Sequence, residues 1–150
     1  MNGTILVHAT AVAIDGEALL LRGPAGAGKS DLALRLIDGG ARLVADDQAV
    51  LRRLGDRVLV RAPAVIAGLI EVRGFGIVRV EAIQEAPLAL IVDLLPSDRI
   101  ERMPQRRVEP VLGLEIGLIE LAAFEASAAA KLRLVRRALA ATRLPAIIGR

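Results

Sequence analysis

The stretch from Leu19 to Asp47, LLLRGPAGAGKSDLALRLIDGGARLVADD, contains the features that decide the fold. A strand-like segment, EALLLR at 17–22, leads into the glycine-rich loop GPAGAGKS at 23–30. The segment SDLALRLID follows with apolar residues at helical spacing, two glycines end that helix, and the buried strand ARLVA then reaches two adjacent aspartates. This order of strand, loop, helix and strand predicts an α/β fold with many strands and few helices.

The loop Gly23–Ser30 fits the Walker A pattern G-x-x-x-x-G-K-[ST], which predicts a P-loop and ATP binding. Its glycines allow backbone N–H groups to face phosphate oxygens, and the next helix directs its positive end at them. Lys29 is expected to reach the β- and γ-phosphates, and the Ser30 hydroxyl to ligate Mg²⁺. The alternative, a glycine-rich turn with an incidental lysine, is disfavoured because a strand precedes the loop and a helix follows it. The expected nucleotide-binding residues are Gly23, Pro24, Ala25, Gly26, Ala27, Gly28, Lys29 and Ser30.

Asp46 and Asp47 directly follow the strand segment RLVA. Neighbouring strand residues point to opposite faces, so we expect one carboxylate to face the phosphate loop and the other to hold the local structure. In phosphoryl transfer to an alcohol, a carboxylate near the hydroxyl orients it and accepts its proton. The alternative is a turn in which aspartate caps exposed N–H groups. The catalytic interpretation is favoured because the pair returns to the sheet edge that carries the phosphate loop.

Two other segments carry residues that suit phosphate chemistry. In LIEVRGFGIV, Glu71 and Arg73 are two residues apart and so lie on one side of a strand. A carboxylate there completes a Mg²⁺ shell and an arginine stabilises the transferred phosphoryl group, but an ordinary surface ion pair fits equally well. His8 is the sole histidine, and taken alone it is better read as a structural residue than as a proton carrier.

Composition limits the remaining possibilities. The chain has 150 residues, 54% of them hydrophobic and 25% charged, which suits one domain over 1–150. A formal charge of +3 and only two aromatic residues argue against a nucleic-acid partner. The longest apolar stretch is interrupted by glutamates and the N-terminus lacks signal-peptide features, so we expect no membrane partner. The absence of cysteine excludes disulfides and is compatible with a cytoplasmic protein.

The C-terminal segment from Lys131 to Arg150 contains basic residues and no acidic ones. It predicts a helix, which either docks an acidic partner or presents a solvated face with cations near its C-terminus. The solvated face is the favoured interpretation. The basic residues are Lys131, Arg133, Arg136, Arg137, Arg143 and Arg150.

In combination, His8 and the segments GPAGAGKS, RLVADD and GLIEVRGFGIV resemble the HPr kinase/phosphorylase family of bacterial enzymes, which phosphorylate a serine on the phosphocarrier protein HPr. The resemblance runs from about His8 to Ile83 and is most specific at LIEVRGFGIV. It implies the P-loop-containing fold, with mixed strands, that the HPr-kinase catalytic domain shares with phosphoenolpyruvate carboxykinases. That fold would explain why the sequence predicts two strands, TILVHATAVAID and EALLLR, before the phosphate loop.

The resemblance also implies a role for individual residues. Lys29 binds phosphate, and Ser30 and Glu71 bind Mg²⁺. Asp47 is the base in phosphorylation and the acid when phosphoserine is attacked, and Asp46 supports it. His8 matches an active-site histidine of the family, and Arg102 in DRIERMP matches a catalytic arginine in a loop. Arg73 is added to the expected catalytic residues on the argument given above for LIEVRGFGIV.

We therefore expect an ATP- and Mg²⁺-dependent protein-serine kinase that acts on an HPr-like carrier of a phosphotransferase system. The resemblance covers only the family's catalytic domain, and RRVEPVLGLEIGLIEL matches the family's dephosphorylation loop poorly, so phosphorylase activity is left open. Longer members form hexamers, which implies a homo-oligomer. The alternatives are a P-loop small-molecule kinase and a nucleotide-binding regulatory module with little turnover.

Overall fold

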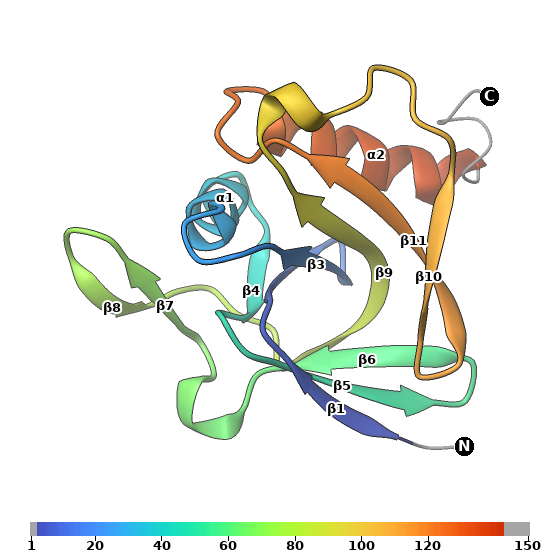
Figure 1. Ribbon diagram of the computed structural model, residues 1–150. Helices are drawn as coiled ribbons and strands as arrows, with labels where there is room; N and C mark the ends of the chain where they lie inside the picture. Colours follow the sequence, from blue (N-terminus) through green and yellow to red (C-terminus); the bar gives the residue numbers. More distant parts are fainter. Residues whose placement is uncertain (1–2, 143–150) are drawn as a thin grey trace.

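The computed structural model describes residues 3–142 and has helices packed on one face of a folded sheet (Figure 1). The chain runs through β1 (Thr4–Val7), β2 (Thr10–Ile14), β3 (Glu17–Arg22), α1 (Lys29–Asp38), β4 (Arg42–Ala45), β5 (Ala49–Leu54) and β6 (Arg57–Arg61). It continues through the 3₁₀ turn η1 (Ala64–Ile66), β7 (Leu69–Val72), β8 (Gly76–Arg79), β9 (Glu85–Leu94), the 3₁₀ turn η2 (Ser97–Arg99), β10 (Arg107–Val111), β11 (Leu114–Leu121) and α2 (Ala128–Thr142).

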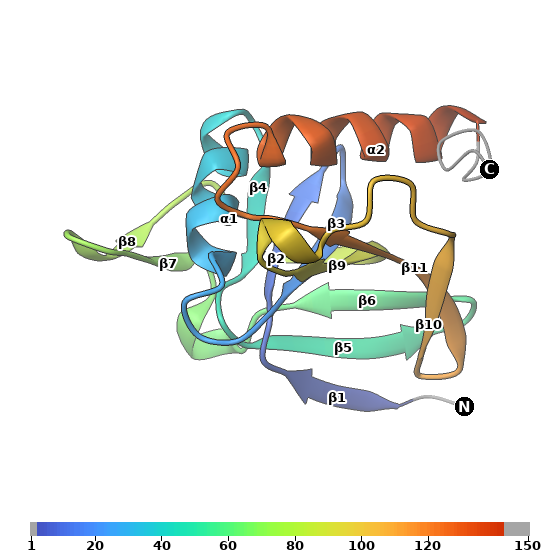
Figure 2. The ribbon, with the colours of Figure 1, turned by 45° about the horizontal axis from the view of Figure 1, so that its top comes forward.

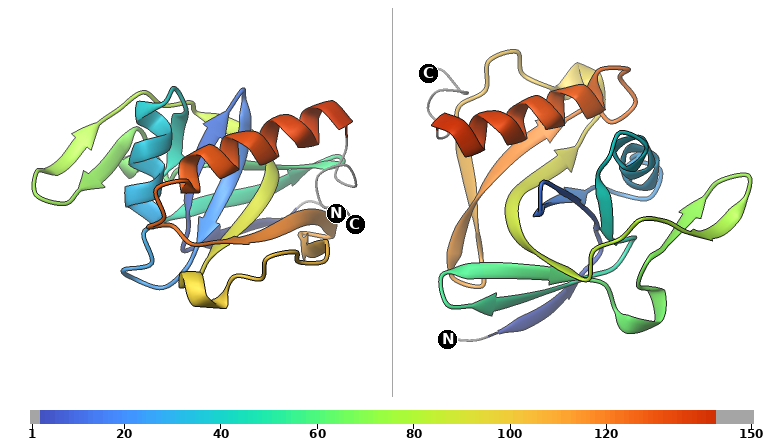
Figure 3. Two further views of the ribbon diagram at one scale, coloured as in Figure 1. Left: turned by 90° about the horizontal axis from the view of Figure 1, so that it is seen from above. Right: turned by 180° about the vertical axis from the view of Figure 1, so that it is seen from behind.

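The long strand β9 joins two sheets. Its residues 85–87 pair antiparallel with β6, which continues into β5 and β1. Its later residues pair parallel with β3 along one edge and with β11 along the other, which gives a second sheet in the order β4-β2-β3-β9-β11-β10. β9 curves as it passes between the two layers (Figure 3, right). The β7–β8 hairpin stands apart and projects from the body of the molecule (Figure 1).

The strand directions bring several loops to one edge of the second sheet. β3, β9 and β11 are parallel, and β4 has the same direction because both β3 and β4 are antiparallel to β2. Four strands therefore end at this edge, and β2 begins there. In open α/β sheets, ligands bind outside the carboxyl ends of the strands. The loops that meet here are 23–28, 46–48, 95–97 and 122–125.

Alternating side chains of β3 enter two cores. Leu19 and Leu21 pack on the helix side, whereas Ala18 and Leu20 pack between the two sheets. Figure 2 shows the resulting layers, with α2 above the second sheet and β5 and β1 below it. The helix-side core also contains Leu32, Leu36, Leu43, Leu90, Val92 and Leu132, which fixes α1 and the phosphate loop to the sheet.

Most of the expected elements are confirmed, with two differences. The segment TILVHATAVAID forms two strands instead of one, because the chain breaks at His8 and pairs with different neighbours on either side. RRVEPVLGLEIGLIEL forms the β10–β11 hairpin, closed by a tight turn in which Leu112 and Gly113 have positive φ.

The basic helix α2 does not present a simple solvated face. Arg133 donates to the carbonyl oxygens of Arg35 and Leu36 at 3.3 Å, where a cation interacts favourably with the C-terminal end of α1. Arg136 is 6% exposed and pairs with Glu17 at 3.0 Å. The expectation of a solvated face is therefore wrong for these two arginines. Of the other basic residues, Lys131 pairs with Glu125 and Arg137 is exposed, while Arg143 and Arg150 lie outside the described residues. Within residues 3–142, no helix has the length and apolar character needed to cross a membrane.

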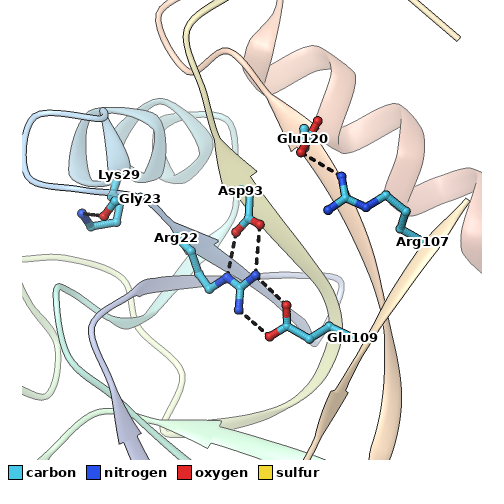
Figure 4. A network of polar contacts seen from close by, with 7 residues as sticks. All are labelled: Arg22, Gly23, Lys29, Asp93, Arg107, Glu109 and Glu120. Atoms are coloured by element: carbon cyan, nitrogen blue, oxygen red, sulfur yellow. Dashed lines mark hydrogen bonds and ion pairs between the residues drawn. The ribbon is translucent and has the colours of Figure 1, made fainter. Parts of the chain in front are cut away.

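Arg22 ties three strands together directly before the phosphate loop (Figure 4). Its guanidinium donates two hydrogen bonds to Asp93 on β9, at 2.7 and 3.0 Å, and two to Glu109 on β10, at 2.6 and 2.8 Å. These bidentate hydrogen bonds, together with the positive charge, hold the pKa of the Glu109 carboxyl below its usual value. They also raise the pKa of Arg22.

Replacing Glu109 with Gln is expected to destabilise the protein by about 1 kcal/mol at neutral pH, because the network is partly exposed, and to lower Tm by about 3 °C. Since the pKa of Glu109 is lower in the folded state, its contribution is complete above the unfolded value of about 4.3 and is lost as pH falls through the folded value. Thermal melts of the wild type and Glu109→Gln should therefore converge below about pH 4. Glu115→Gln, at an exposed position on β11, is the control; a difference between wild type and Glu109→Gln that persists at acid pH would contradict this account.

Candidate active site

The phosphate loop has the backbone that its sequence predicts. Gly26 and Gly28 have φ values of 84° and 100°, in the region that favours glycine. A Cβ at Gly28 would lie 2.8 Å from the Cβ of Ala123 and 3.0 Å from Cζ of Phe124, so no larger residue fits. α1 begins at Lys29, and its first-turn N–H groups are aimed at the loop.

Lys29 lies over the loop that it is expected to serve. Its ammonium group donates to the carbonyl oxygen of Gly23 at 2.6 Å (Figure 4). It also donates to the carbonyl oxygen of Pro24 at 3.1 Å. These contacts hold the charge at the mouth of the loop, where bound phosphate oxygens would be placed.

Asp46 is a buried carboxylate, 8% exposed, that joins four parts of the chain. Its Oδ1 accepts hydrogen bonds from the Ser30 hydroxyl at 2.7 Å and the Thr10 hydroxyl at 3.1 Å. Its Oδ2 accepts from the backbone N–H of Glu71 at 3.0 Å. One side chain at the end of β4 therefore positions the start of α1, the start of β2 and the strand β7.

Asp47 is exposed and has a φ of 69°. Its N–H donates to the Thr10 hydroxyl at 3.0 Å, and its carbonyl oxygen accepts from Ala9 at 3.1 Å. The two aspartates do not alternate as neighbouring residues of a strand do, because β4 ends at Ala45 and the left-handed backbone of Asp47 turns the chain. Both side chains lie on the side of the phosphate loop, Asp46 against Ser30 and Asp47 in the wall of a cleft.

This cleft, called here the acceptor cleft, has a volume of about 350 Å³ and combines the phosphate loop with four charged side chains from outside the loop. Asp47 lies in its wall together with Glu71, near the end of β7, and Arg73, in the turn directly after β7. The cleft is lined by Ala25, Gly26, Gly28, Lys29, Ser30, Asp31, Leu34, Asp47, Glu71, Val72, Arg73 and Phe124.

Two of the residues expected in the site lie outside the acceptor cleft. His8 is exposed between β1 and β2, one residue before the Ala9–Asp47 hydrogen bond, and so lies beside the cleft without lining it. Arg102 follows η2 and lines a separate cleft between the 97–107 segment, β11 and α2, which shares no residue with the acceptor cleft. The roles of both residues stay predictions.

Two residues in or beside the site were not foreseen from the sequence. Thr10 is fully buried and bonds to both members of the aspartate pair; the only signal was a hydroxyl residue at the start of an apolar strand. Phe124 lines the acceptor cleft although it is 70% exposed. The one feature of the sequence that could have drawn attention to Phe124 is that the chain has only two aromatic residues.

The few oxygen ligands that the protein offers in the acceptor cleft fit a Mg²⁺ ion that is bound mainly by the phosphates of a nucleotide. Within residues 3–142, no group of three or more His, Cys, Asp or Glu side chains gathers as a metal site. Ser30 and Glu71 offer oxygen ligands in the acceptor cleft, beside the buried Asp46 carboxylate. Mg²⁺ is commonly bound by one or two carboxylates together with substrate phosphates and water, which this arrangement can provide.

Comparison with known proteins identifies related sequences. An HPr kinase/phosphorylase from Burkholderia lata is 37% identical over 126 residues, covering 77% of this chain and 39% of the relative. An HPr kinase/phosphorylase from Exiguobacterium sp. is 47% identical over 75 residues, covering 49% of this chain and 24% of the relative. The chain thus spans between about a quarter and two fifths of the length of these relatives.

A solved structure has the same fold. The Hpr(Ser) kinase/phosphatase from Coxiella burnetii superposes with a TM-score of 0.80 and 26% sequence identity, covering 89% of this chain and 94% of that one. The sequence model of the HPr Serine kinase C-terminal domain matches residues 1–132, which include the phosphate loop, the aspartate pair and both strands of the β7–β8 hairpin. With this match over most of its length, the chain belongs to the HPr serine kinase C-terminal domain family.

Proposed function

We propose that the chain is an ATP- and Mg²⁺-dependent protein-serine kinase whose substrate is an HPr-like phosphocarrier. The observation that carries this proposal is the position of Asp47, an exposed carboxylate that shares one cleft with the phosphate loop. The names of the curated relatives and of the Coxiella burnetii structure support the choice of HPr as the protein substrate.

Each charged residue of the proposed mechanism has a separate role in phosphoryl transfer from ATP to the serine of the carrier. The serine oxygen forms a bond to the γ-phosphorus, the bond from that phosphorus to the β–γ bridging oxygen breaks, and ADP leaves. Asp47 accepts the serine proton. Lys29 and Arg73 stabilise the charge on the transferred group. Mg²⁺, held by Ser30 and Glu71 together with the phosphates, would neutralise charge on the phosphate oxygens.

The alternatives differ in their expected products. Purified protein would be incubated with ATP, Mg²⁺ and an HPr-type carrier, and new phosphate would be mapped by mass spectrometry. Phosphoserine on the carrier supports the proposal, and transfer only to small alcohols would show a small-molecule kinase. ATP binding without transfer would show a regulatory module, which Lys29, Ser30, Asp47 and Glu71 gathered in one cleft argue against. Incubating the phosphorylated carrier with phosphate tests the reverse reaction.

Replacing Asp47 with Asn is expected to lower the rate of transfer by about 10²- to 10⁴-fold, because the amide cannot accept the serine proton. ATP affinity should change little, since the phosphate loop is untouched. Single-turnover assays and titration calorimetry measure the two effects. Asp56→Asn, in the exposed β5–β6 turn, is the control. Normal transfer by Asp47→Asn would show that another group is the base.

Thr10 is expected to act as a positioning residue for the aspartate pair. Thr10→Val keeps the shape but removes two hydrogen bonds, which should cost about 1–2 kcal/mol of stability. Displacement of Asp47 should also lower kcat about 10- to 100-fold with little effect on the KM for ATP. Thr10→Ser retains the hydroxyl and should restore kcat. If Thr10→Ser is as impaired as Thr10→Val, packing of the methyl group is responsible and the positioning role is wrong.

A further inference from the structure

A second cleft adjoins the phosphate loop on the side opposite to Asp47. It has a volume of about 520 Å³ and is called here the apolar cleft. Its walls are the loops that follow β3, β9 and β11, and most of their side chains here are apolar. The lining residues are Pro24–Ala27, Leu94–Ser97 and Ala122–Glu125.

Phe124 stands between the two clefts and lines both. The chain has only two phenylalanines, and neither is used in a hydrophobic core: Phe75 is 87% exposed and Phe124 is 70% exposed. The ring of Phe124 lies against Gly28, since a Cβ there would be 3.0 Å from Cζ. An exposed aromatic ring held beside a phosphate loop is a surface on which a planar base can stack.

The order of strands separates the two ends of a bound nucleotide. Asp47 follows β4, on one side of β3, whereas the loops after β9 and β11 lie on the other side. Phosphates in the loop that present the terminal group to Asp47 leave the nucleoside to extend toward β9 and β11. Ala25 and Gly26 line both clefts, so the path from one to the other is continuous.

We propose that the apolar cleft binds the purine base of the nucleoside triphosphate, stacked on Phe124. This inference rests on the proposed function, because it requires the phosphates to bind at Gly23–Ser30. A purine matches the cleft in chemistry, being a flat and largely apolar ring system. Two polar groups lie in the lining where the edge of the base would meet them, the hydroxyl of Ser97 and the carboxylate of Glu125, which also pairs with Lys131.

The test compares ATP with inorganic tripolyphosphate, which has the phosphates and no base. Titration calorimetry in Mg²⁺ should show that Phe124→Ala weakens ATP binding about tenfold and leaves tripolyphosphate binding unchanged. Phe124→Trp keeps a stacking surface and should retain ATP affinity. Phe75→Ala removes the other exposed phenylalanine, which lines neither cleft, and is the matched control.

A second variant tests the cleft without altering the contact between Phe124 and Gly28. Ser97 is exposed on the wall formed by the β9 loop, and Ser97→Trp should fill the cleft and weaken ATP without affecting tripolyphosphate. Unchanged ATP affinity in both Phe124→Ala and Ser97→Trp overturns the inference and leaves the proposed function intact. Equal losses for ATP and tripolyphosphate also overturn it, because Phe124 would then support only the loop. If wild-type protein binds neither ligand, both proposals are wrong.

Discussion

The site depends on the buried carboxylate of Asp46. It accepts hydrogen bonds from Ser30, Thr10 and Glu71, which belong to α1, β2 and β7. A buried carboxylate is tolerated only when its oxygens accept hydrogen bonds. Loss of any of these three donors would therefore be costly, which keeps the donors in place around the carboxylate. A single group thereby fixes the positions of three parts of the chain relative to one another: the end of the phosphate loop at Ser30, the strand β2 and the strand β7.

The sheet explains why these parts can meet at all. The parallel direction of β3, β4, β9 and β11 delivers four loops to one edge, and the curvature of β9 allows the same strand to pair with β6 in the other sheet beneath them. Arg22 strengthens this edge one residue before the loop, because it links β3 to β9 and β10 by paired hydrogen bonds (Figure 4). The glycine-rich loop is therefore supported by a rigid strand on one side and by α1 on the other.

Local patterns predicted the parts of the site that local geometry controls. The Walker A loop needs only eight consecutive residues, and Glu71 and Arg73 share a cleft because they are close together in the sequence, at and just after the end of β7. The alternation rule for strands does not describe how the two aspartates are arranged, because β4 ends before them and Asp47 has a left-handed backbone. Thr10 could not be found because its partner Asp46 is 36 residues away in the sequence. The pairing of β9 with strands of both sheets is likewise a long-range property.

Two adjacent residues of the same type acquire different chemistry from their surroundings. Both oxygens of Asp46 are occupied by donors and its side chain is buried, so it has little capacity to take a proton from a bulky acceptor. Asp47 is exposed, and in the part of the chain that the structure describes no donor is hydrogen-bonded to its carboxylate, although its backbone is held at both N–H and C=O. A general base needs a fixed position and a free lone pair. The backbone contacts supply the first and the exposure supplies the second, which is why we propose Asp47 as the base and assign a structural role to Asp46.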